Sequence, residues 1–190
     1  MNEELEKRHE DMVKTLAKAG KEIVTGLSYT SAHNLHMVVG IVGEVAELAE
    51  ALLSTNREHV IEEIGDLEFY ITGLKQGIGI EIPSGEWHGS DNALITPLAE
   101  VIIRLGISSG FLLDAVKKEA IYNKPLDLNE AVTHLAVVGG CVKRIYSLRG
   151  ITREECLEAN YNKLGERYKN HQYSDEQAQQ RNDKTGESQN

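Results

Sequence analysis

Two helical stretches joined by a short polar turn constrain this chain most. Hydrophobic side chains recur every three or four residues over 31–53 and again over 58–76, which is the period of an amphipathic α-helix. Only Ser54-Thr55-Asn56 separate the two stretches, so we expect the helices to pack antiparallel. The positions expected to face the core are Leu35, Val38, Val42, Ala46, Ala49 and Leu53 in the first helix and Ile64, Leu67, Ile71 and Leu74 in the second.

The same period predicts further helices over 2–19, from Thr96-Pro97 onward, over 128–148 and over 152–169. Thr30 or Ser31 is expected to cap the helix at 31. Thr152 with Glu155 three residues on forms a capping-box pattern. Residues from about 171 onward are polar, lack an apolar period and are expected to be disordered or loosely draped. The predicted fold class is all-α, a helical bundle.

Composition narrows the function classes. The chain of 190 residues is 41% hydrophobic, has only 5% aromatic residues and three prolines, and carries a net charge of −10. A nucleic-acid binder needs a positive face, and no Lys/Arg-rich run is present, so no nucleic-acid partner is expected. No apolar run is long enough to span a bilayer and no signal-peptide core is present, so we expect a cytoplasmic protein without a membrane partner. Cys141 and Cys156 have no metal-ligand spacing and are expected to be free thiols.

The two halves of the chain resemble copies of each other. A constant shift pairs Thr30 with Thr96, Gly40 with Gly106, Ile41 with Ile107 and Ala49 with Ala115, and a shift five residues longer pairs Gly79 with Gly150 and Ile80 with Ile151. The extra residues fall in the turn between helices, where an insertion costs little. The predicted organisation is repeat one over 1–80, a linker over 81–93, repeat two over 94–170 and a polar tail over 171–190.

Two acidic pairs are the candidate metal ligands. Glu44 and Glu47 are three residues apart on the first helix, and Glu63 and Asp66 are three apart on the second, so each pair shares a helix face. Across the short turn, the four carboxylates would face one another, and oxygen ligands select Mg²⁺, with Mn²⁺ as a second possibility. Small residues beside them are expected to leave room for a ligand: Gly40, Gly43, Ala51 and Gly65.

These segments resemble a known family. GEVAELAEAL followed by EEIGDLEFY is similar to the paired E-x-x-E and E-x-x-D motifs of the MazG-like, all-α nucleoside triphosphate pyrophosphohydrolases, and the flanks AKAGKEIVTGLSYTSAHNLHM, ECLEANYNKLGERY and YSDEQAQ resemble small phage-type members. The resemblance implies that Glu44, Glu47, Glu63 and Asp66 bind magnesium. It also implies that a (d)NTP is converted to a (d)NMP and pyrophosphate by a metal-activated water, in control of the nucleotide pool.

The chain departs from the family pattern in a consistent way. A basic loop of the type KKxxIYGKPLD usually separates the acidic helices, but here it stands in the second half as KKEAIYNKPLD at 117–127. The second half lacks the acids, since the aligned positions are Gly110, Leu113, His134 and Val137. The resemblance therefore implies a fused dimer with one metal site, in which repeat two supplies Tyr122 and Lys124, with Lys117 or Lys118, to the substrate.

The resemblance implies further substrate-binding residues on the last predicted helix. Asn160 and Lys163 lie one helical turn apart, with Arg167 a further turn on, and such a face can donate hydrogen bonds and positive charge to phosphate or base. His33 and His36 are candidates for lining the nucleoside pocket. Because family members pair, a homo-oligomer of the fused-dimer chains is also expected to be possible.

Three alternatives stay open at this point. Phosphoribosyl-ATP pyrophosphohydrolases share the acidic helices. A di-iron carboxylate bundle needs two Glu-x-x-His motifs, and only Glu6 with His9 fits that spacing. A non-catalytic nucleotide-binding or interaction module would use the degenerate half as a docking surface.

Overall fold

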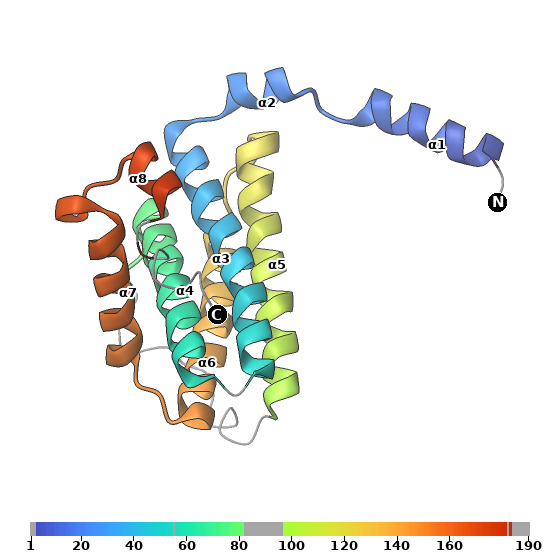
Figure 1. The fold of residues 1–190 in the computed structure, drawn as a ribbon. Coiled ribbons are helices and arrows are strands. Elements are labelled where there is room, and N and C mark those ends of the chain that lie inside the picture. The colour runs from blue at the N-terminus through green and yellow to red at the C-terminus, as the bar shows by residue number, and fades with distance from the viewer. Residues whose placement is uncertain (1–2, 55, 82–96, 182, 184–190) are drawn as a thin grey trace.

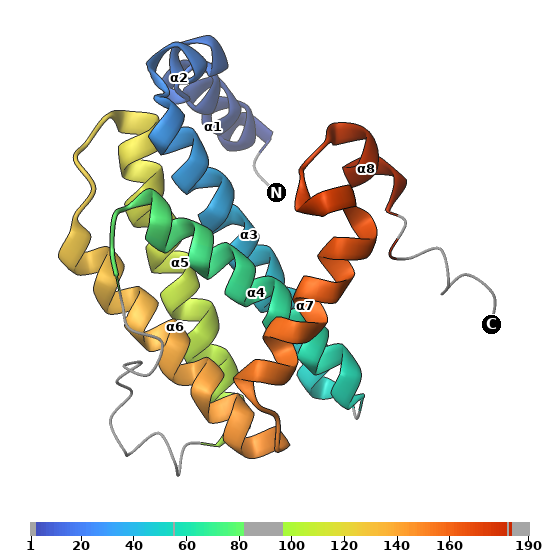
Figure 2. The same cartoon turned by 90° about the vertical axis from the view of Figure 1, so that its left-hand side faces the viewer.

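The computed structural model describes residues 3–54, 56–81, 97–181 and 183. Every regular element in these ranges is a helix, as Figures 1 and 2 show, which confirms the all-α prediction. The helices are α1 (Glu3–Leu16), α2 (Gly20–Gly26), α3 (Tyr29–Leu53), α4 (Arg57–Gly77), α5 (Leu98–Tyr122), α6 (Leu128–Arg149), α7 (Arg153–Arg167), the 3₁₀ turn η2 (Lys169–His171) and α8 (Asp175–Gln180).

Four long helices form the body of the bundle. α3 packs on α4, α5 packs on α6, and α3 also packs on α5, so that two helical hairpins share one core. α7 lies along the outer side of α4, away from α5 (Figure 2). Two hairpins are what a duplication predicts, and the repeat relation itself stays a prediction. The linker predicted over 81–93 and the Thr96 cap lie, except for residue 81, outside the described residues.

Local signals explain most helix ends. Thr152 accepts a hydrogen bond from the Glu155 backbone N–H while the Glu155 carboxylate accepts one from the Thr152 N–H, which confirms the predicted capping box. The cap of α3 was predicted one turn too late, because Ser28 is the N-cap and its hydroxyl accepts from the Ser31 N–H at 3.0 Å. α8 forms where the sequence predicts an irregular tail, since Ser174 caps it by accepting from the Gln177 N–H.

The predicted core is right for α4 and wrong in phase for α3. Ile64, Leu67, Ile71 and Leu74 are all fully or almost fully buried. On α3, of the predicted positions only Val38 is buried, whereas Leu53 is 84% exposed. The residues that α3 buries are instead Ser31, Asn34, Met37, Val38, Ile41, Val45, Leu48, Ala51 and Leu52. α3 carries apolar side chains on nearly every face, so its period alone does not select the face that packs.

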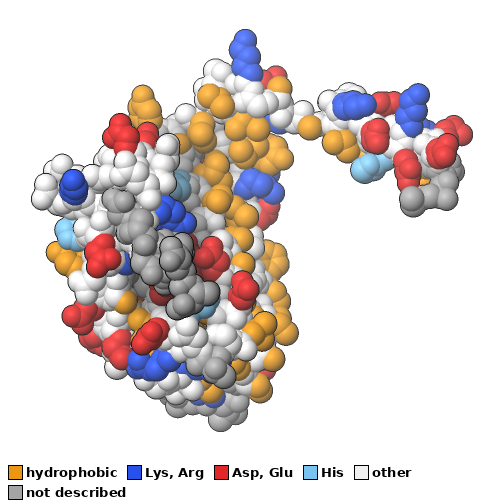
Figure 3. Space-filling view, in the orientation of Figure 1, with side chains coloured by type: hydrophobic (Ala, Val, Ile, Leu, Met, Phe, Trp, Pro, Cys, Tyr) orange, Lys and Arg blue, Asp and Glu red, His pale blue; other side chains and the backbone are white. Residues whose placement is uncertain are grey.

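Apolar side chains also remain on the outside. Hydrophobic side chains run along the right-hand edge of the body in Figure 3. The exposed large apolar residues of α3 and α5 include Val39, Ile103, Ile107 and Phe111, each about half exposed or more. A band of this kind is what a homo-oligomer would cover, and pairing of chains stays a prediction.

Among the described residues, we find no helix that combines the length and the apolar character needed to cross a membrane.

Candidate metal centre

The acidic residues of α3 and α4 line one cleft. One carboxylate oxygen each of Glu44, Glu63 and Asp66 lies within 4.8 Å of the other two, a spacing that can hold one metal ion. Glu47 lines the same cleft but is not a member of this three-oxygen group. The structure therefore brings together three of the four predicted ligands and places the fourth beside them.

Burial and mutual repulsion make this cluster unusual. Burial, followed by the negative charges of Asp66, Glu47 and Glu63, raises the pKa of the Glu44 carboxyl to about 8. Burial and the charges of Glu47 and Asp66 also raise the pKa of Glu63. Carboxyl groups in such surroundings favour protonation unless a cation compensates them.

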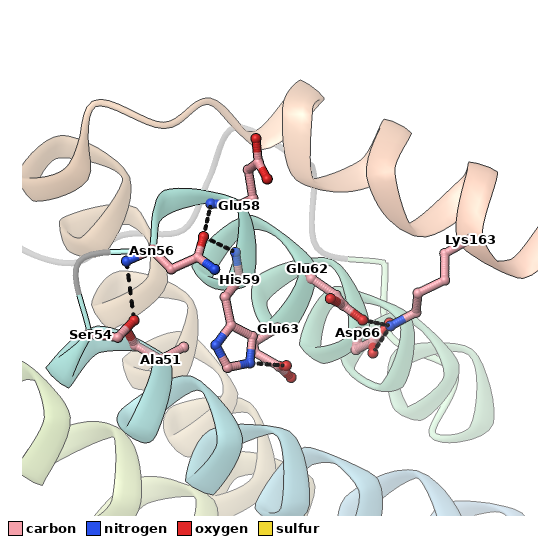
Figure 4. Close-up of polar contacts among 9 residues, drawn as sticks. All are labelled: Ala51, Ser54, Asn56, Glu58, His59, Glu62, Glu63, Asp66 and Lys163. Carbon is pink, nitrogen blue, oxygen red and sulfur yellow. Dashed lines mark hydrogen bonds and ion pairs between the residues drawn. The ribbon is translucent and has the colours of Figure 1, made fainter. Parts of the chain in front are cut away.

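Two oxygens of the cluster have no donor. Glu44 Oε2 and Glu63 Oε2 are buried and accept no hydrogen bond from any described residue. The other oxygen of Glu63 lies 3.0 Å from His59 Nε2, a contact visible in Figure 4. Leaving a buried carboxylate oxygen unsatisfied is costly, and oxygen-only donors suit Mg²⁺ or Mn²⁺. The residues present thus fit a hard divalent cation.

α7 supplies the neighbouring polar groups. The Asn160 side-chain amide donates to Asp66 Oδ1 at 2.7 Å, and Lys163 Nζ bonds Glu62 Oε1 at 2.8 Å and also Asp66 Oδ2 (Figure 4). The predicted Asn160 and Lys163 therefore do meet the acidic helices, although they come from a segment about a hundred residues away along the chain.

A glycine on α4 makes this approach possible. A Cβ built on Gly65 would lie 2.6 Å from the Cys156 carbonyl oxygen and 2.9 Å from Asn160 Cβ. The start of α7 is fixed next to it, because the Arg153 guanidinium forms a two-pronged pair with Glu68 at 2.9 and 3.0 Å. Tyr146 of α6 donates to the same carboxylate at 3.2 Å.

The small residues do not leave the ligand room that the sequence predicts, with one exception. The space beside Gly65 holds α7, and a Cβ on Gly40 would lie 2.2 Å from the ring of Tyr70, which fills that space. Ala51 is buried in the core. Of the three glycines, only Gly43 has no atom within 4 Å of a built Cβ. The small residues act mainly by allowing close packing around the site.

The cleft continues from the acids past aromatic and basic side chains. Its volume is about 720 Å³, enough for a nucleotide-sized ligand. His36 lies in its wall, with its ring edge-on to Tyr70 at 6.0 Å between centroids. Residues that sequence reasoning did not assign to the site also line it: Glu62, Phe69, Tyr70, Leu164, Tyr168, His171, Tyr173, Ala178 and Arg181. The YSDEQAQ segment was the one signal that pointed to its last part.

Other predicted residues lie elsewhere. Tyr122 and Lys124 are exposed at the C-terminal end of α5 and are not among the residues that line the cleft. Lys117 and Lys118 of the same helix pair with Asp114 at 2.6 and 2.9 Å. His33 also lies outside the lining, and its Nε2 contacts the Gly73 carbonyl oxygen at 3.0 Å. Within this chain, the second half therefore contributes α7 to the cleft rather than the basic loop.

The second half has no comparable acidic site in the described residues. Among all described residues, the group of Glu44, Glu63 and Asp66, which lies in the first half, is the one cluster of potential metal ligands. At a position aligned with an acid, His134 stacks on Phe111 with 5.1 Å between ring centroids.

Comparisons with known proteins add no identity, since no protein-family model, curated protein or solved structure matches this chain.

Proposed function

We propose that this protein is a nucleoside triphosphate pyrophosphohydrolase that depends on Mg²⁺ or Mn²⁺. The observation that carries the proposal is the group of three carboxylate oxygens from Glu44, Glu63 and Asp66 within 4.8 Å. Two buried, unsatisfied oxygens in this group support a cation as the missing partner. The size of the adjoining cleft and its aromatic and basic lining support a ligand with both phosphates and a ring.

Glu44, Glu63 and Asp66 would hold the cation. A bound Mg²⁺ would supply Lewis-acid polarisation of the phosphates and a more acidic water. Asn160 and Lys163 hold Asp66 in place through both of its oxygens. Lys163 also adds positive charge beside the acids, which favours a polyphosphate in a chain of net charge −10.

The reaction is a hydrolysis of one phosphoric anhydride. A water oxygen attacks the α-phosphorus, the bond between that phosphorus and the bridging oxygen breaks, and pyrophosphate leaves with the electron pair. Glu47 lines the cleft outside the three-oxygen group, and we assign it the role of accepting the proton of the attacking water. Tyr70, Phe69 and His36 offer ring faces and edges for the base.

A substrate panel tests this function. Each common dNTP and NTP, together with phosphoribosyl-ATP, is incubated with the protein and Mg²⁺, and the products are separated by ion-exchange chromatography. We expect a nucleoside monophosphate and pyrophosphate from at least one dNTP or NTP. Hydrolysis of phosphoribosyl-ATP alone would assign the related pyrophosphohydrolase activity instead, and metal-dependent nucleotide binding without any product would indicate a binding module.

Variants of this protein distinguish hydrolysis at the assigned metal site from hydrolysis by a contaminating enzyme. Glu63→Gln removes one ligand charge and should lower the rate about 100-fold or more. Glu58→Gln is the matched control, because Glu58 is exposed on the same helix and points away from the cluster in Figure 4. Equal rates for Glu63→Gln and the unaltered protein would show that the assigned metal site is wrong.

A further inference from the structure

The C-terminal segment folds back and forms one wall of the cleft. After η2 the chain turns, and α8 lies beside the C-terminal end of α7, as Figure 2 shows. Tyr173, Ala178 and Arg181 of this segment are part of the cleft lining. The segment therefore lies where an extended ligand that starts at the acidic cluster would pass.

Asp183 holds an arginine of the cleft. Arg167 donates to Asp183 through Nε at 2.8 Å and through Nη2 at 2.5 Å. The Asp183 side chain is 1% exposed and that of Arg167 is 16% exposed, so the pair is largely withdrawn from water. The guanidinium lowers the pKa of Asp183, which keeps this carboxyl ionised.

The Asp183 carboxylate makes a contact that a phosphate could also make. Arginine binds carboxylates and phosphates with the same two parallel N–H donors. Arg167 is one of the three α7 residues that the family resemblance assigns to substrate binding, and it lines the cleft. In the structure its donors already have an anionic partner within the same chain.

We propose that Asp183 is a built-in competitor for an anionic group of the ligand at Arg167, so that a phosphate binds there by displacing Asp183 and releasing the C-terminal segment. This competition rests on the proposed function in one respect, namely that the ligand of the cleft carries a phosphate group.

The segment is held lightly enough for this exchange. α8 has six residues and buries none of them, so its release uncovers no core. Among the described residues, the segment is fixed, besides the Asp183 pair, by the cap of α8, by a hydrogen bond from the Lys169 N–H to Gln177 Oε1 at 3.2 Å and by the Tyr168–Tyr173 ring contact at 5.6 Å between centroids. Elements with few buried contacts open at low free-energy cost. A resident competitor lowers the apparent affinity for the ligand, because only the fraction of molecules in which the competitor has left the site can bind the ligand.

Binding of inorganic tripolyphosphate in the presence of Mg²⁺, measured by calorimetry, tests the competition. Asp183→Asn should lower the dissociation constant about tenfold relative to the unaltered protein, equivalent to about 1.4 kcal/mol. Asp183→Ala should act in the same direction, while Glu176→Gln, which removes the same charge from an exposed position on α8, should leave the dissociation constant unchanged. In an Arg167→Gln background, Asp183→Asn should have no further effect. Equal or weaker binding by both Asp183 variants would overturn the proposal.

Hydrogen exchange provides a second readout. The Ala178 and Arg181 amides bond the Ser174 and Gln177 carbonyls at 3.0 and 3.3 Å, and their exchange reports the closed segment. Tripolyphosphate should speed this exchange in the unaltered protein, whereas slower exchange would overturn the release step. The two proposals fail separately. Tighter binding by Asp183→Asn without nucleotide hydrolysis would remove only the proposed activity, and hydrolysis with unchanged binding would remove only the competition.

Discussion

Gly65→Ala tests how closely α7 must approach α4. A methyl group at this position would lie 2.6 Å from the Cys156 carbonyl oxygen, a backbone atom that no rotamer change can move. Replacing glycine by alanine inside a helix gains about 1 kcal/mol on its own, but overpacking costs about 1–3 kcal/mol. We expect the clash to exceed the gain, because α7 is also fixed by the Arg153–Glu68 pair. The free energy of unfolding should therefore fall by up to about 2 kcal/mol.

The matched control is Gly106→Ala in α5, where a built Cβ has no atom within 4 Å. This variant should gain the full helical benefit, so its melting temperature should rise by about 2–4 °C, while that of Gly65→Ala should fall by up to about 8 °C. Thermal unfolding by circular dichroism measures both. Gly65→Ala should also weaken metal binding, since Asn160 is moved away from Asp66. A Gly65→Ala protein as stable as Gly106→Ala would refute the close packing of α7 described above.

Four further predictions follow from buried groups. Glu68→Gln leaves the Arg153 guanidinium without its anionic partner and should cost about 3 kcal/mol in urea unfolding, where a loss below about 1 kcal/mol would contradict the pairing. Cys141 and Cys156 should resist a thiol reagent such as DTNB at pH 8 in the folded protein, because burial raises the pKa of the two thiols to about 11 and about 12; rapid labelling of either would be inconsistent with the packing. Metal binding at pH 7 should release about one proton, because the pKa of the Glu44 carboxyl is raised to about 8 and the carboxyl must ionise to bind the metal. Calorimetry in two buffers with different heats of ionisation measures this release, and an equal binding heat in both buffers would contradict it. Without metal, the same raised pKa means that the folded state binds the proton more tightly than the unfolded chain, so the Glu44 contribution to stability is present below about pH 4.5 and is lost as the pH rises to about 8.

Periodicity predicted the bounds of the long helices well because their signals are local, whereas the short α2 and α8 were not predicted. Expected bounds of 58–76 and 128–148 compare with Arg57–Gly77 and Leu128–Arg149 in the structure. The face that a helix buries is less local, and α3 shows the difference. The apolar side chains of α3 lie on nearly all of its faces, so the positions of α4 and α5 decide which face is buried. The hydrophobic period of a single helix carries no information on those positions.

The candidate site was predicted in part for the same reason. Glu44, Glu63 and Asp66 come together because a short turn joins α3 and α4 and brings the two helices side by side. The i, i+3 spacing places Glu63 and Asp66 on the same face of α4. Lys124 was assigned to the site from a resemblance and lies outside the cleft, because where α5 ends relative to α3 depends on tertiary packing. The contribution of Asp183 had no sequence signal, since a single aspartate in a polar segment is ordinary until Arg167 is seen beside it.

Binding of Mn²⁺ tests the central claim most directly. Loss of the free-ion signal in electron paramagnetic resonance counts the bound ions and gives their dissociation constant. The account predicts at least one Mn²⁺ per chain, with about tenfold or weaker binding for Glu44→Gln. Glu50→Gln, at an exposed position on the same helix, should bind as the unaltered protein does. Equal binding by Glu44→Gln, or no binding by the unaltered protein, would contradict a metal centre formed by Glu44, Glu63 and Asp66.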